Sequence, residues 1–173
     1  VTVGCVVGTF TGQTCFCEAW LRATHNSEPS GAVGHWGSSQ NQSWAPPMYA
    51  EDEYVDLLCA DVVHTYGALC FNGSSLMNDV TGATGYSETD HWNIFGDPSL
   101  QLRTLPPFAL TVVHTDTISF GQPTFAVTVP GRSGALAALS DGGVLLGYGY
   151  TTASGQVTLP VSGQLPPGGN LKL

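Results

Sequence analysis

Cysteine and histidine side chains can carry out nucleophilic and acid–base chemistry near neutral pH, and this sequence has five of each. Cys5 is the first of them, and it lies in the apolar stretch VTVGCVVGTF, three residues before Gly8. A cysteine among β-branched residues is usually a buried packing residue. It could instead be a nucleophile, because ligands of open parallel sheets bind beyond the carboxyl ends of the strands. This stretch alone leaves both interpretations open.

The other four cysteines give no clear sign of a metal site. Cys15 and Cys17 are spaced too closely for an ordinary zinc knuckle, and no second Cys/His pair follows at ligand spacing. We therefore predict no structural metal. An odd number of cysteines leaves at least one thiol outside any intrachain disulfide. Cys59 and Cys70 could form one.

Each histidine has a plain structural interpretation, so none is a strong candidate for a general base. His35 is the least implausible, because it lies in a predicted buried strand that should neighbour the strand of Cys5. His64 follows an acidic helix, and the helix dipole favours a positive charge at that end. The remaining three are His25, His91 and His114.

The charge balance limits the kinds of partner. The chain has 4 basic and 13 acidic side chains, which argues against binding to nucleic acid or to anionic membrane surfaces. No apolar stretch is long enough to span a bilayer. Residues 1–103 carry all of the net charge of −9, whereas residues 104–173 are neutral overall. This difference predicts two domains, and the scarcity of lysine suggests an exported protein.

Residues 1–103 show the alternation of strands and helices that is typical of a parallel sheet covered by helices. The expected strands are residues 2–7 and 31–39, followed by a tight turn and a short strand within residues 91–103. The expected helices are residues 15–25, 49–63 and 66–80, and residues 40–47 form a polar loop. Acidic residues crowd the first turn of the second helix, and Gly67 and Gly73 weaken the third helix prediction.

Residues 104–173 have a different period. Pro106 and Pro107 indicate a linker, after which short alternating strands recur between Gly, Pro and Asp turns. This pattern predicts a small β-sandwich. The expected strands are residues 109–113, 117–120, 125–129, 134–143, 144–150 and 155–161, and residues 170–173 look like the start of another.

Four segments of the first part, taken in order, resemble the gingipain-type cysteine peptidases. They read TVGCVVGTF, CFCEAWLRA, NQSWAPPM and FGDPSLQLRT, and they cover residues 2–10, 15–23, 41–48 and 95–104. The resemblance implies an α/β, caspase-like fold with a mostly parallel sheet and flanking helices, of which residues 1–103 are the C-terminal part. It also implies that residues 104–173 are an immunoglobulin-like module, although position and length support this more than motif does.

The same resemblance implies roles for individual residues. Cys5 would be the nucleophile, and its backbone N–H would contribute to an oxyanion hole. The general base would be a His-Gly at the end of the preceding strand, upstream of Val1. Val3, Gln42, Trp44 and Met48 would line the pocket for the residue before the cut. Trp44 could also be a surface aromatic residue fixed by the prolines that follow it.

The leading hypothesis is therefore a cysteine endopeptidase that uses a Cys/His dyad. This chain would carry the nucleophile without the base. The alternative is an inactive or structural cell-surface protein that keeps the peptidase fold as a scaffold. The expected partners are a protein or peptide substrate and the remainder of the same polypeptide. We expect no cofactor in this chain, although structural calcium could bind upstream, and we expect a secreted or cell-surface bacterial protein. Because the chain starts within a strand, we expect it to be an excerpt of a longer polypeptide.

Overall fold

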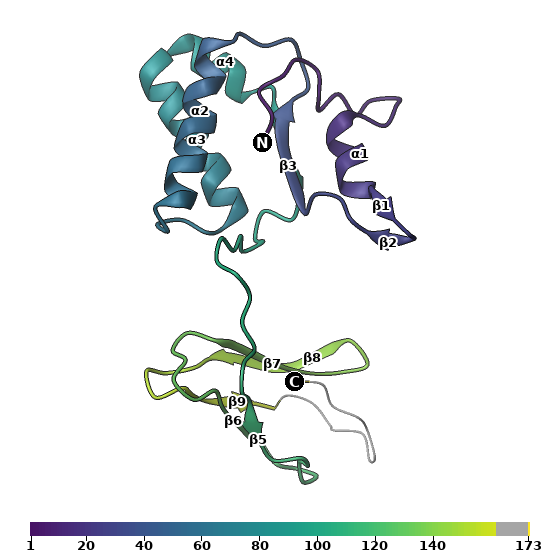
Figure 1. Cartoon of the computed structure of the whole chain (residues 1–173), viewed down its shortest axis with the longest axis vertical. Helices are drawn as coiled ribbons and strands as arrows, with labels where there is room; N and C mark the ends of the chain where they lie inside the picture. The colour runs from purple at the N-terminus through teal and green to yellow at the C-terminus, as the bar shows by residue number, and fades with distance from the viewer. Residues whose placement is uncertain (162–172) are drawn as a thin grey trace. The chain divides into compact units, whose positions relative to one another are not determined.

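In the computed structural model, which describes residues 1–161 and 173, the chain divides into two units, Val1–Leu105 and Pro106–Leu173 (Figure 1). Each unit has its own cluster of buried apolar side chains.

The first unit is built around the strand β3 (Gly34–Ser38). It pairs in antiparallel register with β4 (Trp92–Gly96), so that Trp36 lies opposite Ile94. The only parallel pairing among the described residues is a single bridge between Thr2 and Gly37. The sequence predicted mostly parallel pairing, and the β3–β4 ladder differs from that prediction. The reason is β4 itself, which ends at Gly96, directly before the turn that begins with Asp97 and Pro98, and runs antiparallel to β3.

Helices lie on both sides of β3. Figure 1 shows α1 (Phe16–Arg22) on one side, and α2 (Ala45–Cys59), α3 (Tyr66–Thr81) and α4 (Ala83–Thr89) on the other. Between α1 and β3 the chain forms a small hairpin from β1 (Thr24–His25) and β2 (Glu28–Pro29). The predicted first helix therefore ends at Arg22, three residues earlier than expected.

The helix α2 starts four residues earlier than the sequence predicted. Pro46 and Pro47 were assigned to a loop, but proline is well tolerated in the first turn of a helix, where its missing N–H would have no partner. The acidic side chains of residues 51–56 consequently do not lie in the first turn. The sequence also predicts an apolar face made of Tyr54, Leu57, Leu58 and Val62. This face is only partly buried, because Tyr54 is buried whereas Val62 lies beyond the helix and is exposed.

The core of the first unit lies between β3 and the pair α2–α3. Trp36 packs against Trp92 edge-on and stacks on Tyr54. Gly73 of α3 allows the two helices to approach closely, because a Cβ there would lie 2.5 Å from the Ala50 carbonyl oxygen. The glycine that weakened the helix prediction is thus a packing residue. The buried cluster comprises Trp36, Ala50, Tyr54, Tyr66, Leu69, Cys70, Met77 and Trp92.

The second unit consists of two antiparallel sheets in two layers (Figure 1). One sheet has the order β5 (Val113–His114), β6 (Thr124–Thr128) and β9 (Gln156–Pro160). The other pairs β7 (Leu136–Asp141) with β8 (Val144–Tyr150). Both sheets contribute to one apolar cluster, whose members are Phe125, Val127, Val129, Ala137, Leu139, Leu146 and Leu159.

Most strands predicted for this unit are present. Residues 117–120 are an exception, since they form no strand. The strand predicted over residues 109–113 is another, because β5 includes only its last residue, Val113. The predicted final strand, residues 170–173, lies outside the described residues except for Leu173.

Candidate active site

Cys5 lies at a turn where the chain leaves the side of β3. Thr2 N–H donates to the Trp36 carbonyl at 3.0 Å, which places the chain beside the strand. Residues 5–8 then form a turn, so the predicted strand over residues 2–7 is wrong except for a single bridge at Thr2. Gly8 N–H returns to β3 by donating to the Ser38 carbonyl at 2.8 Å. The turn therefore presents Cys5 at the end of the segment that runs beside β3.

The residue after Cys5 has an unusual backbone conformation. Val6 has φ of 54°, in the left-handed region that a β-branched side chain rarely occupies. Its N–H donates to the Gln40 carbonyl at 3.0 Å, which holds the turn in place. Strained backbone of this kind is concentrated at functional sites, where the surrounding structure enforces it.

Cys5 is accessible both at its thiol and at its backbone. The side chain is exposed, and its Sγ donates a weak hydrogen bond to the Gln42 carbonyl at 3.8 Å. Among the described residues, the Cys5 N–H has no hydrogen-bond partner. A free N–H beside an exposed thiol is what an oxyanion hole requires, since the oxyanion forms next to the attacked carbon.

Close packing of the turn on β3 depends on Gly37. A Cβ at this position would lie 2.7 Å from Cγ2 of Val7 and 3.4 Å from Sγ of Cys17. The helix α1 supports the turn from its other side, because Cys17 N–H donates to the Val7 carbonyl at 3.1 Å. The turn is thus fixed by contacts with both a strand and a helix.

Three of the four predicted pocket residues come from the loop after β3 and the start of α2. Trp44 precedes the helix and is 74% exposed, and Met48, one helical turn later, is 44% exposed. Both amide atoms of the Gln42 side chain are buried, and neither has a hydrogen-bond partner within the described part of the chain. The fourth residue, Val3, is half-buried and packs against the core cluster.

The loop of residues 39–43 is attached to the α4–β4 junction by hydrogen bonds that the sequence did not reveal. Glu88 accepts a hydrogen bond from Ser43 N–H at 2.8 Å. The His91 carbonyl accepts from Ser39 N–H at 2.8 Å and from the Ser39 hydroxyl at 3.0 Å. The only sequence signal for Glu88 is an acidic residue two positions before Asp90, a polar pattern that is typical of a solvated surface.

None of the five histidines forms a hydrogen bond with Cys5. The place predicted for His64, directly after the acidic helix, is wrong, because α2 ends at Cys59. His35 is buried, contacts the Thr2 hydroxyl at 2.9 Å, and packs edge-on against Phe16. Burial lowers the pKa of His35 because it disfavours the charged imidazolium. His64 lies 3.4 Å from the Asp61 carboxylate.

All five cysteines are free, so the Cys59–Cys70 disulfide is wrong. Cys59 is exposed at the end of α2, whereas Cys70 is buried in α3. Burial raises the pKa of Cys70 and that of Cys17 to about 12, which keeps both thiols protonated and unreactive. Cys5 and Cys59 are therefore the exposed thiols of the chain.

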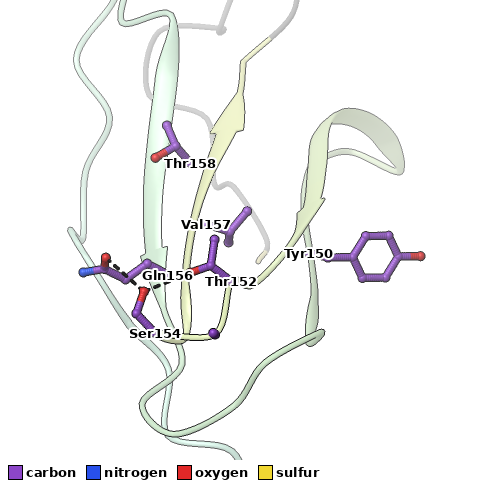
Figure 2. Close-up of a pocket in the computed structure, with 7 residues that line it drawn as sticks. Tyr150, Thr152, Ser154, Gln156, Val157 and Thr158 are labelled. Atoms are coloured by element: carbon purple, nitrogen blue, oxygen red, sulfur yellow. Dashed lines mark hydrogen bonds between the residues drawn. The ribbon is translucent and has the colours of Figure 1, made fainter.

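No group of three or more His, Cys, Asp or Glu side chains that could hold a metal ion occurs within residues 1–161. In this same part of the chain no helix is long and apolar enough to cross a membrane. Figure 2 shows a pocket in the second unit, where the Ser154 hydroxyl bonds to Thr152 and Gln156 and Tyr150 points away from them. It shares no residue with the site around Cys5.

Comparison with known proteins identifies the class to which this fold and site belong. The model of peptidase family C25 matches residues 1–103, the part that contains Cys5 and the loop facing it. The chain therefore belongs to peptidase family C25, and it is a gingipain-type cysteine peptidase sequence.

Its similar relatives are bacterial. The chain is 39% identical over 150 residues to gingipain R2 of Porphyromonas gingivalis. The matched stretch covers 84% of this chain and 20% of that protein. It is 34% identical over 166 residues to gingipain R1 of the same species, covering 93% of this chain and 16% of that protein. The chain thus spans about a fifth of the curated relatives that it matches.

Solved structures of the family have the same fold. The crystal structure of the Arg-specific cysteine proteinase gingipain R superposes with a TM-score of 0.83 at 34% identity, over 94% of this chain and 38% of that chain. A complex of the pro- and mature domains of a Porphyromonas gingivalis gingipain gives a TM-score of 0.82 at 35% identity, over 94% of this chain and 39% of that chain.

Proposed function

We propose that the protein carrying this chain is a cysteine endopeptidase and that Cys5 is its nucleophile. The observation that carries the proposal is the accessible thiol of Cys5 beside a free backbone N–H, within the segment that matches peptidase family C25. The buried thiols of Cys17 and Cys70 lack this accessibility, and burial raises the pKa of both.

In the proposed reaction, the Cys5 thiolate attacks the carbonyl carbon of the scissile peptide bond. A C–S bond forms, and the carbonyl oxygen becomes an oxyanion. The C–N bond then breaks, and the amine leaves with a proton from the general acid. Water attacks the thioester and gives a proton to the same group acting as base; the C–S bond breaks, which releases the carboxylic acid and regenerates the Cys5 thiolate beside the protonated base. The net reaction consumes one water for each peptide bond.

The Cys5 N–H would stabilise the oxyanion. It is free in the structure, whereas the next amide, that of Val6, is bound to Gln40. Val6, whose N–H is bound, has a left-handed backbone conformation, whereas the N–H of the preceding Cys5 is free. A preorganised donor of this type is typically worth about 10²–10³ in kcat.

The general base would come from outside this chain. No described histidine is hydrogen-bonded to Cys5, and the carbonyl of Gln42, which does contact the thiol, cannot act as a base at neutral pH. The chain covers only 38% of the solved gingipain R chain. We therefore assign the base to another part of the same polypeptide.

The substrate residue before the cut would bind next to Gln42, Trp44 and Met48. Trp44 is 74% exposed, so most of its large apolar surface is not packed against this chain. This exposure favours a role in binding. The amide of Gln42 is buried without a partner among the described residues, so its side chain would have to turn outward to hydrogen-bond to the substrate. Val3, two residues before the nucleophile, would form the wall between this pocket and the core.

We also propose the finer architecture and the location. The first unit would be part of a caspase-like domain, and the second an immunoglobulin-like module, as its two packed sheets suggest. The protein would be secreted or displayed on a bacterial surface, in keeping with its low lysine content and its similarity to gingipains.

Replacement of Cys5 in the full-length protein tests the function. The Cys5→Ala variant should lose hydrolysis of protein and peptide substrates, whereas Cys59→Ala, at the other exposed thiol, should keep it. Equal activity in the wild type and in Cys5→Ala would refute the proposal. An absence of hydrolysis by the wild type would instead favour the scaffold alternative.

A further inference from the structure

We infer that Glu88 is a positioning residue for the loop that faces the nucleophile. This inference rests on the proposed function, because the loop matters for catalysis only if Cys5 is the nucleophile. It assigns a catalytic task to α4, a helix that contributes no residue to the predicted site.

Glu88 is an unusual residue at its position. Its side chain is only 5% exposed, and one carboxylate oxygen accepts the Ser43 N–H at 2.8 Å. The other oxygen, Oε2, is buried without a partner. No basic side chain pairs with Glu88 in the part of the chain that the structure describes. Burying a carboxylate so sparsely bonded disfavours folding, so packing alone is a poor explanation for it.

The bond to Ser43 leads to the thiol in two steps. Ser43 directly follows Gln42, whose carbonyl oxygen accepts the weak hydrogen bond from Cys5 Sγ at 3.8 Å. The orientation of the peptide unit between Gln42 and Ser43 therefore sets both contacts, because this planar unit contains both the Gln42 C=O and the Ser43 N–H. Glu88 accepts the N–H of this peptide unit, and the Cys5 thiol donates to its C=O.

The opposite end of the loop is fixed to the same junction. Ser39 donates through its N–H and its hydroxyl to the His91 carbonyl, and His91 N–H in turn donates to the Glu88 carbonyl at 3.0 Å. Between these ends, Gln40 accepts the Val6 N–H from the turn that carries Cys5. The loop thus connects the α4–β4 junction with the nucleophile turn through hydrogen bonds. Among the described residues that bond to the loop from this junction, Glu88 is the one that does so through a charged side chain.

The test compares three substitutions of Glu88 in the full-length peptidase. Glu88→Gln keeps the length of the side chain and an oxygen acceptor, whereas Glu88→Asp keeps the charge and shortens the reach by one methylene. Glu88→Ala removes the acceptor. If positioning through Ser43 is the role, Glu88→Gln should keep kcat/KM within about threefold, and the other two should lose about tenfold or more, as expected for a lost charge-assisted hydrogen bond.

Two controls separate positioning from general stability. Met77→Ala, in the core of the same unit, should lower the melting temperature, and it should keep kcat/KM at a temperature where it is folded. Ser87→Ala, an exposed neighbour on α4, should change neither quantity. A merely structural role would make kcat/KM follow the melting temperature across all variants.

The outcomes are distinct. Full activity of folded Glu88→Asp and Glu88→Ala, with Cys5→Ala inactive, would overturn this inference and leave the proposed function standing. Activity in Cys5→Ala would overturn both. If the two Glu88 variants fail to fold, amide hydrogen exchange in the unmodified protein decides: Ser43 N–H should exchange slowly although its side chain is exposed, and rapid exchange would overturn the inference.

Discussion

At the scale of single residues, the site combines strain with exposure. Val6 holds a left-handed conformation that disfavours a β-branched residue by about 1–3 kcal/mol. The neighbouring Cys5 has an exposed thiol and a free N–H, and Trp44 exposes most of its indole ring. None of these features stabilises the folded chain, which is what is expected of residues kept for binding or chemistry.

Trp44 gives the first prediction. Trp44→Ala should leave the melting temperature nearly unchanged, because an exposed side chain contributes little, typically within about 0.5 kcal/mol. Its kcat/KM for peptides should fall by about tenfold, chiefly through KM, since a lost binding contact of 1.4 kcal/mol corresponds to that factor. Phe71→Ala is the matched control, as Phe71 is 71% exposed on α3. Equal effects of the two substitutions would contradict a pocket role for Trp44.

His35 gives a prediction about pH. Burial lowers its pKa in the folded state below the ordinary value of 6.5, so the unfolded state binds more protons below that pH. The free energy of unfolding should therefore fall as the pH drops below about 6.5, and His35→Gln should reduce this dependence. Urea unfolding of both proteins at pH 7.5 and 5.5 measures it, with His25→Gln as a control at an exposed histidine. A histidine 35 signal that titrates above pH 6.5 in NMR would contradict the account.

At the scale of elements, the nucleophile turn is positioned by its packing on β3. Gly37→Ala would place a Cβ 2.7 Å from Cγ2 of Val7. We expect this substitution to destabilise the protein by about 1–3 kcal/mol, as overpacking usually does, and to lower peptidase activity by displacing the turn.

Val7→Ala removes the clashing methyl groups, so the double variant Gly37→Ala/Val7→Ala should recover part of the stability that Gly37→Ala loses. A double-mutant cycle from urea midpoints measures this coupling. Additive effects would show that the turn does not pack on Gly37 as described.

The elements show where sequence reasoning succeeds. The helix α3 was predicted to within one residue, and β3 was predicted in the right place but three residues too long at its start, because apolar pattern and helical period are local signals. The start of α2 was missed because Pro46 and Pro47 suit both a loop and the first turn of a helix. The strand over residues 2–7 was overpredicted, since its apolar composition fits a strand while its contacts with β3 and α1 fold it into a turn.

The site could be predicted only in part from the sequence, because local motifs do not reveal contacts between distant residues. Motifs indicated Cys5, Gln42, Trp44 and Met48, and the structure places the Gln42 carbonyl against the Cys5 thiol. Motifs could not indicate Glu88, because its role depends on a hydrogen bond to a residue 45 positions away. They also gave no sign of the strained Val6.

At the scale of the whole molecule, the chain has two separate apolar cores. Leu69 lies in the first and Leu159 in the second, and both are fully buried. Leu→Ala at either site should destabilise its own unit by about 2–5 kcal/mol. Hydrogen exchange followed by peptide mapping should show lost protection within residues 1–105 for Leu69→Ala and within residues 106–161 for Leu159→Ala. Equal loss in both units after either substitution would contradict two independent cores.

The central claim is that Cys5 is the nucleophile, and covalent trapping tests it most directly. The full-length protein is treated with a peptidyl chloromethyl ketone, digested, and mapped by mass spectrometry. The account predicts one adduct on Cys5, formed in step with the loss of peptidase activity, and no adduct on Cys59, the other exposed thiol. Complete inactivation with an unmodified Cys5, or with the adduct on another residue, would contradict it.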